Sequence, residues 1–159
     1  MIEFTQDKSK ASYTNRYITN LASVPFQVFI NPKITQTSKE KMSFWHGCLS
    51  ALEHKKGIVA TYKWIEYEAF NEKAEMIKGR LEDFGAVIFQ HEFRHLLGGL
   101  FLDKAKTFHT QEELWELFDK KALKPYDKAS KNTPLLLEDY LVGESIEEYS
   151  TRNKGKCSL

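Results

Sequence analysis

The sequence has little of what marks several protein classes. It contains two cysteines, Cys48 and Cys157, which allow one disulfide at most and exclude a disulfide scaffold. Lysine plus arginine (23) nearly balance aspartate plus glutamate (22), so the net charge of +1 gives no electrostatic case for binding nucleic acid or a membrane surface. No apolar run approaches the ~18 residues of a membrane-spanning helix, and residues 1–20 carry no signal-peptide core. We therefore expect a protein of the reducing cytoplasm, without membrane or nucleic-acid partners.

The composition is that of an ordinary globular domain. Hydrophobic residues make up 42% of the chain and charged residues 28%, and 159 residues suffice to bury one sizeable core. We expect a single domain over residues 1–149 and a flexible tail over residues 150–159. Predicted strands come first and predicted helices follow, so the expected fold class is α+β.

Two segments in the first half have the pattern of strands. Residues 24–32 (VPFQVFINP) place apolar side chains at alternate positions, and the pattern predicts a strand that ends at Asn31-Pro32. Residues 57–70 are rich in β-branched and aromatic types and, with the turn-like residues 71–73 and the AEMIKG that follows, predict a hairpin. The polar residues 5–23 and 35–43 are predicted to be loops.

The hydrophobic period changes after Asp83, a predicted N-cap. Apolar and histidine side chains then recur on one face of a helix, and Gly98-Gly99 predicts its end. The residues on that face are Phe84, Val87, Ile88, His91 and His95.

Two further helices are predicted toward the C-terminus. One begins at Thr110 with a capping box to Glu113, buries Leu114, Leu117 and Phe118, and ends before Pro125. The other begins at Thr133-Pro134 and runs through LLLEDYLVG. Residues 107–149 are therefore expected to form a C-terminal helical extension.

The stretch QHEFRHLLGG (90–99) contains the pattern H-E-x-x-H. His91 and His95 lie about 40° apart around a helix axis, so two consecutive turns can present both imidazoles to one cation. Glu92 is rotated by roughly 100° from His91 and suits a base for metal-bound water better than a third ligand. The alternative is a pair of buried histidines that happen to be in register.

A catalytic metal site needs a third ligand. The candidates are Cys48, His46, His54 and His109. Cys48 stands in HGCLS, where Gly47 lets the backbone come close, although a free cysteine is more often a buried hydrophobic residue than a ligand.

Two motifs together resemble a known family. WHGCLS (45–50) and QHEFRHLLGGLFLD (90–103) resemble the E-G-C-[LV]-S and Q-H-E-x-x-H-L-x-G motifs of peptide deformylases, with similar spacing. INPKI (30–34) resembles the segment which that family places before its cysteine motif. The resemblance spans roughly residues 24–104. It implies an antiparallel β-sheet packed around a central metal-binding helix, here with additional C-terminal helices.

The resemblance also implies the chemistry of the site. Cys48, His91 and His95 would hold one divalent metal ion, Fe(II) in the cell with Zn or Ni as substitutes, and leave a fourth position for water. Glu92 would take the proton of that water and return it to the departing amine, while the backbone N–H of Leu49 would hold the oxyanion.

The substrate implied by the resemblance is the N-formyl-methionyl end of a nascent peptide. By position, a methionine pocket would be lined by Phe44, Phe84, Val87 and Ile88, and His46 is a further predicted substrate-binding residue; plain core packing is the alternative for the four apolar residues. No oligomeric state follows from the sequence.

The chain departs from the family pattern at three places. It has no G-x-G-L-A-A-x-Q segment, which a reading frame that starts upstream of Met1 would explain. His46 replaces the glutamate of E-G-C, while Ile58–Thr61 replace the V-P-R that holds its arginine partner. We expect His46 to be a partly exposed residue at the rim, with a bond to a ligand or a ligand role as alternatives. Arg94 replaces an aspartate and is expected on the outer side of the helix, with little effect on the chemistry.

Two other functions remain open at this point. The chain could be a deformylase-like protein that binds metal with weak or no catalysis, or, less well supported, a zinc peptidase of the H-E-x-x-H type. His54 and His109 have no counterpart in the family motifs and are expected at the surface. The C-terminal helices could cover the body of the domain or bind a partner.

Overall fold

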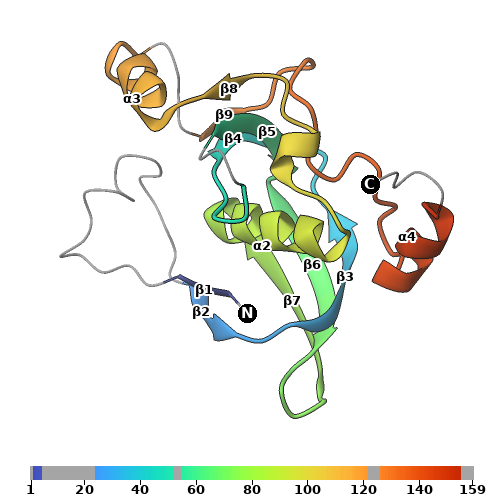
Figure 1. The fold of residues 1–159 in the computed structure, drawn as a ribbon. Helices are drawn as coiled ribbons and strands as arrows, with labels where there is room; N and C mark the ends of the chain where they lie inside the picture. Colours follow the sequence, from blue (N-terminus) through green and yellow to red (C-terminus); the bar gives the residue numbers. More distant parts are fainter. Residues whose placement is uncertain (1, 5–23, 52–54, 122–125, 155–159) are drawn as a thin grey trace.

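The computed structural model describes residues 2–4, 24–51, 55–121 and 126–154 (Figure 1). The described elements are the strands β1 (Ile2–Phe4), β2 (Val24–Gln27), β3 (Ile30–Thr37), β4 (Lys41–His46), β5 (Lys56–Tyr62), β6 (Trp64–Phe70), β7 (Met76–Glu82), β8 (Phe108–His109) and β9 (Tyr126–Lys128), and the helices α2 (Asp83–Leu96), η2 (Phe101–Asp103), α3 (Gln111–Asp119) and α4 (Ile146–Arg152). The predicted loop over 5–23 lies outside the described residues. Among the described helices, none is long and apolar enough to cross a membrane.

The strands form three sheets whose neighbours all pair antiparallel. Their orders are β1-β2, β3-β6-β7 and β8-β5-β4-β9. Helix α2 contacts β5 of one large sheet and β6 and β7 of the other (Figure 1). The prediction of an α+β fold with antiparallel strands around a central helix is confirmed.

One bent hairpin connects the two larger sheets. β3 pairs with β6 and β4 pairs with β5, and the chain changes sheet at residues 38–40 and again at Lys63. Backbone hydrogen bonds join the two corners: Ser38 N–H donates to the Trp64 carbonyl (3.0 Å), and Lys63 N–H to the Glu40 carbonyl (3.2 Å). The predicted hairpin with its turn at residues 71–73 is confirmed, because β6 and β7 pair on either side of a turn at residues 71–75. Its first arm is wrong in part: residues 57–70 are not one strand but two, β5 and β6, which belong to different sheets.

The predicted strand over residues 24–32 is also wrong at its end. β2 stops at Gln27, and β3 begins at Ile30 and passes through Asn31-Pro32. β3 lies at the edge of its sheet, and its register with β6 shifts between Ile30 and Lys33, which is where a proline is tolerated. Asn31 has φ 50°, a left-handed conformation that asparagine adopts more readily than most residues. The predicted loop over residues 35–43 is mostly strand.

Helix α2 ends as predicted and begins differently. After Leu97, Gly98 adopts φ 80°, and its N–H donates to the His95 carbonyl (2.9 Å). At the other end Glu82 is the N-cap, without a side-chain cap, and Asp83 is the first helical residue with φ 48°. The Asp83 carboxylate accepts a hydrogen bond from the Tyr126 hydroxyl (3.2 Å) instead of capping the helix.

The C-terminal third contains less helix than predicted. The capping box of α3 is confirmed, because Thr110 and Glu113 each donate a backbone N–H to the other's side chain. Residues 133–144 form turns instead of a helix, and an isolated parallel bridge joins Leu135 to Ala60 of β5. Phe118's side chain and Pro125 lie outside the described residues.

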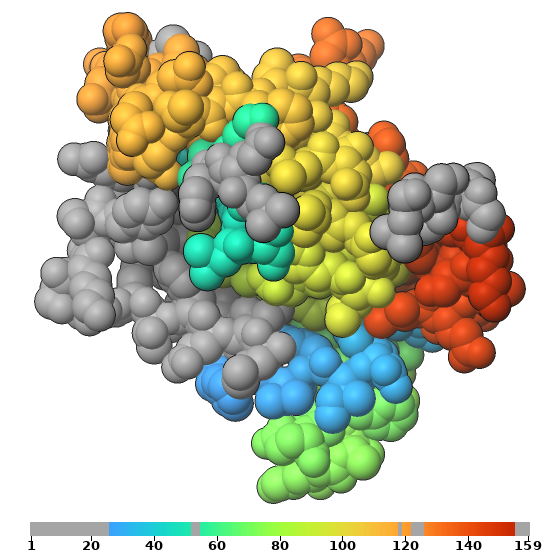
Figure 2. Space-filling view, in the orientation of Figure 1, coloured from blue at the N-terminus to red at the C-terminus, as the bar shows by residue number. Residues whose placement is uncertain are grey.

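α4 was not predicted as a helix. Ser145 caps it in a reciprocal pair with Glu148, and it continues to Arg152, so the tail expected from residue 150 is helical at its start. Asn153 is buried, and its side chain donates to the Tyr149 carbonyl (2.9 Å). In Figure 2, α3 (orange) and α4 (red) lie at opposite edges of the molecule.

The main core lies between α2, the bent hairpin and the C-terminal turns. Its largest fully buried side chains include Ile34, Ile65, Phe89, Phe93, Phe101, Leu136 and Leu137. A second cluster joins Trp45 of β4 to Leu114 of α3, with Trp115 and Leu117 packed against it. α3 thus covers the outer face of the sheet that carries the site.

Candidate metal centre

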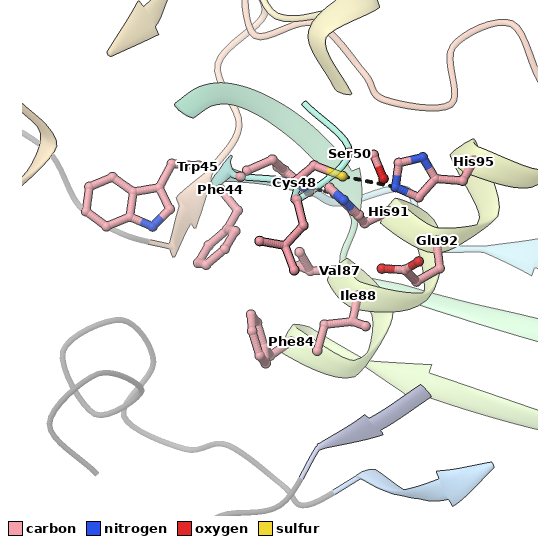
Figure 3. A pocket seen from close by; sticks show the side chains of 13 residues that line it. Phe44, Trp45, Cys48, Ser50, Phe84, Val87, Ile88, His91, Glu92 and His95 are labelled. Atoms are coloured by element: carbon pink, nitrogen blue, oxygen red, sulfur yellow. Dashed lines mark hydrogen bonds between the residues drawn. The ribbon is translucent and has the colours of Figure 1, made fainter. Parts of the chain in front are cut away.

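Cys48 lies in the turn that follows β4. The Ala51 N–H donates to the Cys48 carbonyl (3.1 Å) and closes the turn. A Cβ atom at Gly47 would lie 2.2 Å from Nζ of Lys56, so a larger residue there would push this flexible side chain aside. In Figure 2 this segment (teal) lies at the surface, while the thiol is half-buried and turned toward α2 (Figure 3).

α2 carries His91 and His95 on consecutive turns. Their ring centroids are 5.0 Å apart, and their planes differ by 86°. Gln90, for which no role was predicted, fixes this part of the helix to β5: its buried amide accepts from the Tyr62 N–H (2.8 Å) and donates to the Tyr62 carbonyl (2.9 Å). A glutamine on the buried face of a helix was the available signal, because such a side chain must find backbone partners.

The structure brings the three predicted ligand residues together. One ligand atom from each of Cys48, His91 and His95 lies within 4.8 Å of the other two. Cys48 Sγ is 3.3 Å from His95 Nε2 (Figure 3), and His95 Nδ1 is 3.2 Å from the Gly99 carbonyl oxygen. Because that carbonyl can only accept, Nδ1 carries the proton and Nε2 is left with a lone pair facing the thiol.

The prediction that His46 is a partly exposed rim residue is wrong. Its side chain extends from the end of β4 into the interior and is only 3% exposed. Its Nδ1 lies 3.0 Å from Nδ1 of His91. Burial and, second, the neighbouring His91 lower the pKa of His46 to about 3, so the ring is neutral at physiological pH. Its Nε2 is buried without a hydrogen-bond partner among the described residues, which costs about 1–3 kcal/mol.

The prediction for Arg94 is wrong as well. Its side chain is 8% exposed and faces the C-terminal segment, where Nη1 contacts both carboxylate oxygens of Asp139 (3.0 and 3.1 Å). Its Nη2 donates to Asp103 (3.3 Å), which also accepts from the Leu100 N–H (2.8 Å). The reason is topological: residues 133–153 pack on the face of α2 that the isolated helix would expose to water. Arg94 thereby holds the turn whose Gly99 carbonyl orients His95.

A pocket of about 450 Å³ opens beside the three ligand residues. The four apolar residues that were predicted to bind substrate all line it, as do both ligand histidines, Glu92 and Leu49 (Figure 3). The four are Phe44, Phe84, Val87 and Ile88. Glu92 is exposed and is not one of the three clustered ligand residues, while the Leu49 side chain is 98% exposed. The pocket is therefore apolar on one side and carries the candidate ligands on the other.

The other two candidate ligands lie elsewhere. His109 is on β8, half-buried, with its Nδ1 3.8 Å from a Glu113 carboxylate oxygen. His54 lies outside the described residues.

We expect the metal-free protein to lose stability as the pH falls below about 6.5. Burial lowers the pKa of His46 to about 3, and burial followed by the nearby His95 lowers that of His91 to about 4. In the unfolded chain both rings bind a proton near 6.5, so between pH 6.5 and 4 the unfolded state binds more protons and stability falls with pH. Two rings give a slope of at most about 2.7 kcal/mol per pH unit.

Urea unfolding of chelator-treated protein at pH 7.5, 6.0 and 5.5 measures this slope, in a range where most carboxylates stay ionised. His46→Asn removes one of the two rings and should reduce the slope by about half. A free energy of unfolding that does not change over this range would contradict two buried neutral rings.

The donor set fits a divalent transition metal. One thiolate and two imidazoles suit zinc, iron or nickel, and metal–ligand bonds of about 2.0–2.3 Å require ligand atoms roughly 3.5 Å apart. The 3.3 Å between Cys48 Sγ and His95 Nε2 agrees with this spacing. Three protein ligands beside an accessible pocket are the arrangement of a catalytic site, not of a closed structural one.

Comparisons with known proteins point to one family, and the matched region contains the three candidate ligands. The sequence model of the polypeptide deformylase family matches residues 1–111. Peptide deformylase 2 of a Nostoc species is 43% identical over 94 residues, which are 57% of this chain and 52% of the relative. Peptide deformylase 2 of Clostridium perfringens is 38% identical over 93 residues, 58% of this chain and 56% of the relative.

A solved peptide deformylase from Acinetobacter baumannii superposes with a TM-score of 0.49 and 30% identity, over 52% of this chain and 51% of that one. The chain spans about half the length of the curated relatives it matches. The family match covers well over half of its residues and includes both ligand motifs, and on this ground the chain belongs to the polypeptide deformylase family.

Proposed function

We propose that this chain is a metal-dependent hydrolase that removes the formyl group from N-formyl-methionyl peptides. The observation that carries the proposal is the convergence of Cys48, His91 and His95 beside an apolar pocket. Relatives that are 38–43% identical are named peptide deformylases, which supports the same activity here. We also propose that residues 1–149 act as one deformylase-like domain and that the reaction takes place in the cytoplasm on nascent chains.

Cys48, His91 and His95 would hold one divalent ion, which we propose to be Fe(II) in the cell, with Zn or Ni as functional substitutes. When bound, such an ion polarises carbonyl oxygens and lowers the pKa of water. The turn after β4 and helix α2 supply the ligands from two rigid elements, so the three donor atoms need little rearrangement to close on an ion.

We assign the proton transfers to Glu92. Its carboxylate lines the pocket next to His91 without belonging to the ligand cluster, so it can accept a proton from the attacking water. Water adds to the formyl carbon, the C–N bond breaks, and the same carboxyl group returns the proton to the amine nitrogen. The products are formate and a peptide with a free N-terminal methionine.

We propose that the backbone N–H of Leu49 stabilises the negative charge that develops on the formyl oxygen. Leu49 follows Cys48 in the turn and lines the same pocket, and its side chain is exposed to solvent, which leaves its backbone amide for this role. The apolar residues Phe44, Phe84, Val87 and Ile88 would surround the methionine side chain. His46 also lines the pocket, but its side chain is only 3% exposed and bonded to His91, so we do not assign it to substrate contact.

The test is formate release from formyl-Met-Ala-Ser by the 159-residue chain loaded with Ni(II), or anaerobically with Fe(II). We expect release that stops when a chelator removes the metal. Cys48→Ser should lose both metal and activity, because a hydroxyl is a far poorer donor than a thiolate. Cys157→Ser is the matched control and should keep both. A chain that binds one metal ion but releases no formate would refute the proposed activity.

A further inference from the structure

The hydrogen bond between His46 and His91 has two possible polarities. It joins the two Nδ1 atoms at 3.0 Å, and the ring planes differ by only 5°. One proton occupies such a bond, so one ring donates and the other accepts. The direction of donation decides which nitrogen of His91 has a lone pair left for a metal.

Metal binding is compatible with one polarity only. Nδ1 of His91 is engaged by His46, so Nε2 is the atom that His91 can offer to a cation. A neutral imidazole with a lone pair at Nε2 carries its proton on Nδ1, and this N–H must donate to Nδ1 of His46. If His46 donated instead, the proton of His91 would lie on Nε2 and block the metal.

The Nε2 side of the His46 ring leaves the acceptor state available. The neutral ring that accepts at Nδ1 must carry its own proton on Nε2, and Nε2 is the atom that the structure buries without a partner in the described part of the chain. The ring contacts Phe44 and Phe101, which offer no acceptor of conventional strength. The fold leaves one N–H unpaired and keeps the bond to His91.

We propose that His46 is a positioning residue of the metal site: by accepting a hydrogen bond from Nδ1 of His91, it holds His91 in the tautomer whose Nε2 binds a divalent cation. This inference rests on the proposed metal-dependent function. His46 pairs with Gly57 of β5, and the next residues of that strand, Ile58–Thr61, supply no cationic side chain. A carboxylate buried in place of His46 would have no partner from this stretch, so a neutral acceptor suits the position.

The affinity for Zn(II) tests the proposal through a matched pair of variants. His46→Asn keeps an acceptor oxygen near the place of Nδ1, whereas His46→Leu has nearly the same shape and no acceptor. Competition with a chromophoric chelator at pH 7.5 should show an affinity about 10–100-fold weaker for His46→Leu and close to wild type for His46→Asn. Urea unfolding of the metal-free variants gives the free energy of unfolding of each, and the comparison shows whether the two substitutions cost the same packing.

A second measurement reads the tautomers in the wild-type chain and does not depend on whether a variant folds. Long-range ¹⁵N–¹H spectra of the Zn(II)-loaded protein should show His91 protonated at Nδ1 and His46 at Nε2. A proton on Nδ1 of His46, or equal zinc affinities for the two variants, would overturn the proposal and leave the proposed activity standing. A wild-type chain that binds no zinc would overturn both.

Discussion

Glu92→Gln should lower the rate of formate release by about 10²- to 10⁴-fold, because an amide cannot take the proton of the attacking water. The bound metal should remain, since Glu92 lies outside the cluster of Cys48, His91 and His95. The measurement is kcat with formyl-Met-Ala-Ser, together with metal content per chain. Glutamine has nearly the size of glutamate, so the pocket keeps its shape.

The matched control is Glu112→Gln, the same substitution at an exposed position in the first turn of α3. It should leave the rate unchanged. If Glu92→Gln retained the full rate with its metal bound, another group would have to move the proton. If neither wild type nor variant released formate while one metal stayed bound, the chain would be the inactive metal-binding relative.

Arg94→Met should destabilise the metal-free protein by about 2–4 kcal/mol. Removing one partner of a buried ion pair typically costs about 3–5 kcal/mol, and the value is lower here because Asp139 is 32% exposed and keeps some water. Asp139→Asn should cost at least as much, since the buried guanidinium cannot lose its charge. Urea unfolding monitored by circular dichroism gives both free energies.

The double variant Arg94→Met/Asp139→Asn completes the cycle and measures the coupling between the two side chains. We expect it to be more stable than the sum of the single effects predicts, because it leaves neither charge alone. Strictly additive effects would mean that the pair contributes nothing. The single Arg94→Met variant should also bind Zn(II) more weakly, since Arg94 and Asp103 hold the turn whose Gly99 carbonyl orients His95.

The ligand motifs could be predicted from sequence because each depends on a short stretch. A separation of four positions places the rings of His91 and His95 on one face of any helix, and Gly98 ends that helix through its own backbone freedom. Asn31-Pro32 misled the strand prediction for the opposite reason. Whether this dipeptide ends a strand or sits in a bulge depends on the neighbouring strand, and β3 lies at an edge.

The environment of the site residues could not be predicted in the same way. Arg94 has a charged, long side chain that is normally exposed, and its burial depends on Asp139, which lies 45 residues later in a segment that was expected to be helical. His46 follows the alternation of β4, but whether its face meets solvent or α2 depends on how the hairpin bends at residues 38–40 and 63.

By itself the sequence determined the helix that bears His91 and His95 and the family to which the two motifs belong. These features depend on residues close together in the chain, whose spacing the backbone geometry converts directly into shape. Only the tertiary structure decided that Cys48 meets the two imidazoles, that His46 bonds to His91, and that the C-terminal segment neutralises Arg94. Each of these is a contact between distant segments, and burial and pairing there depend on which surfaces pack together.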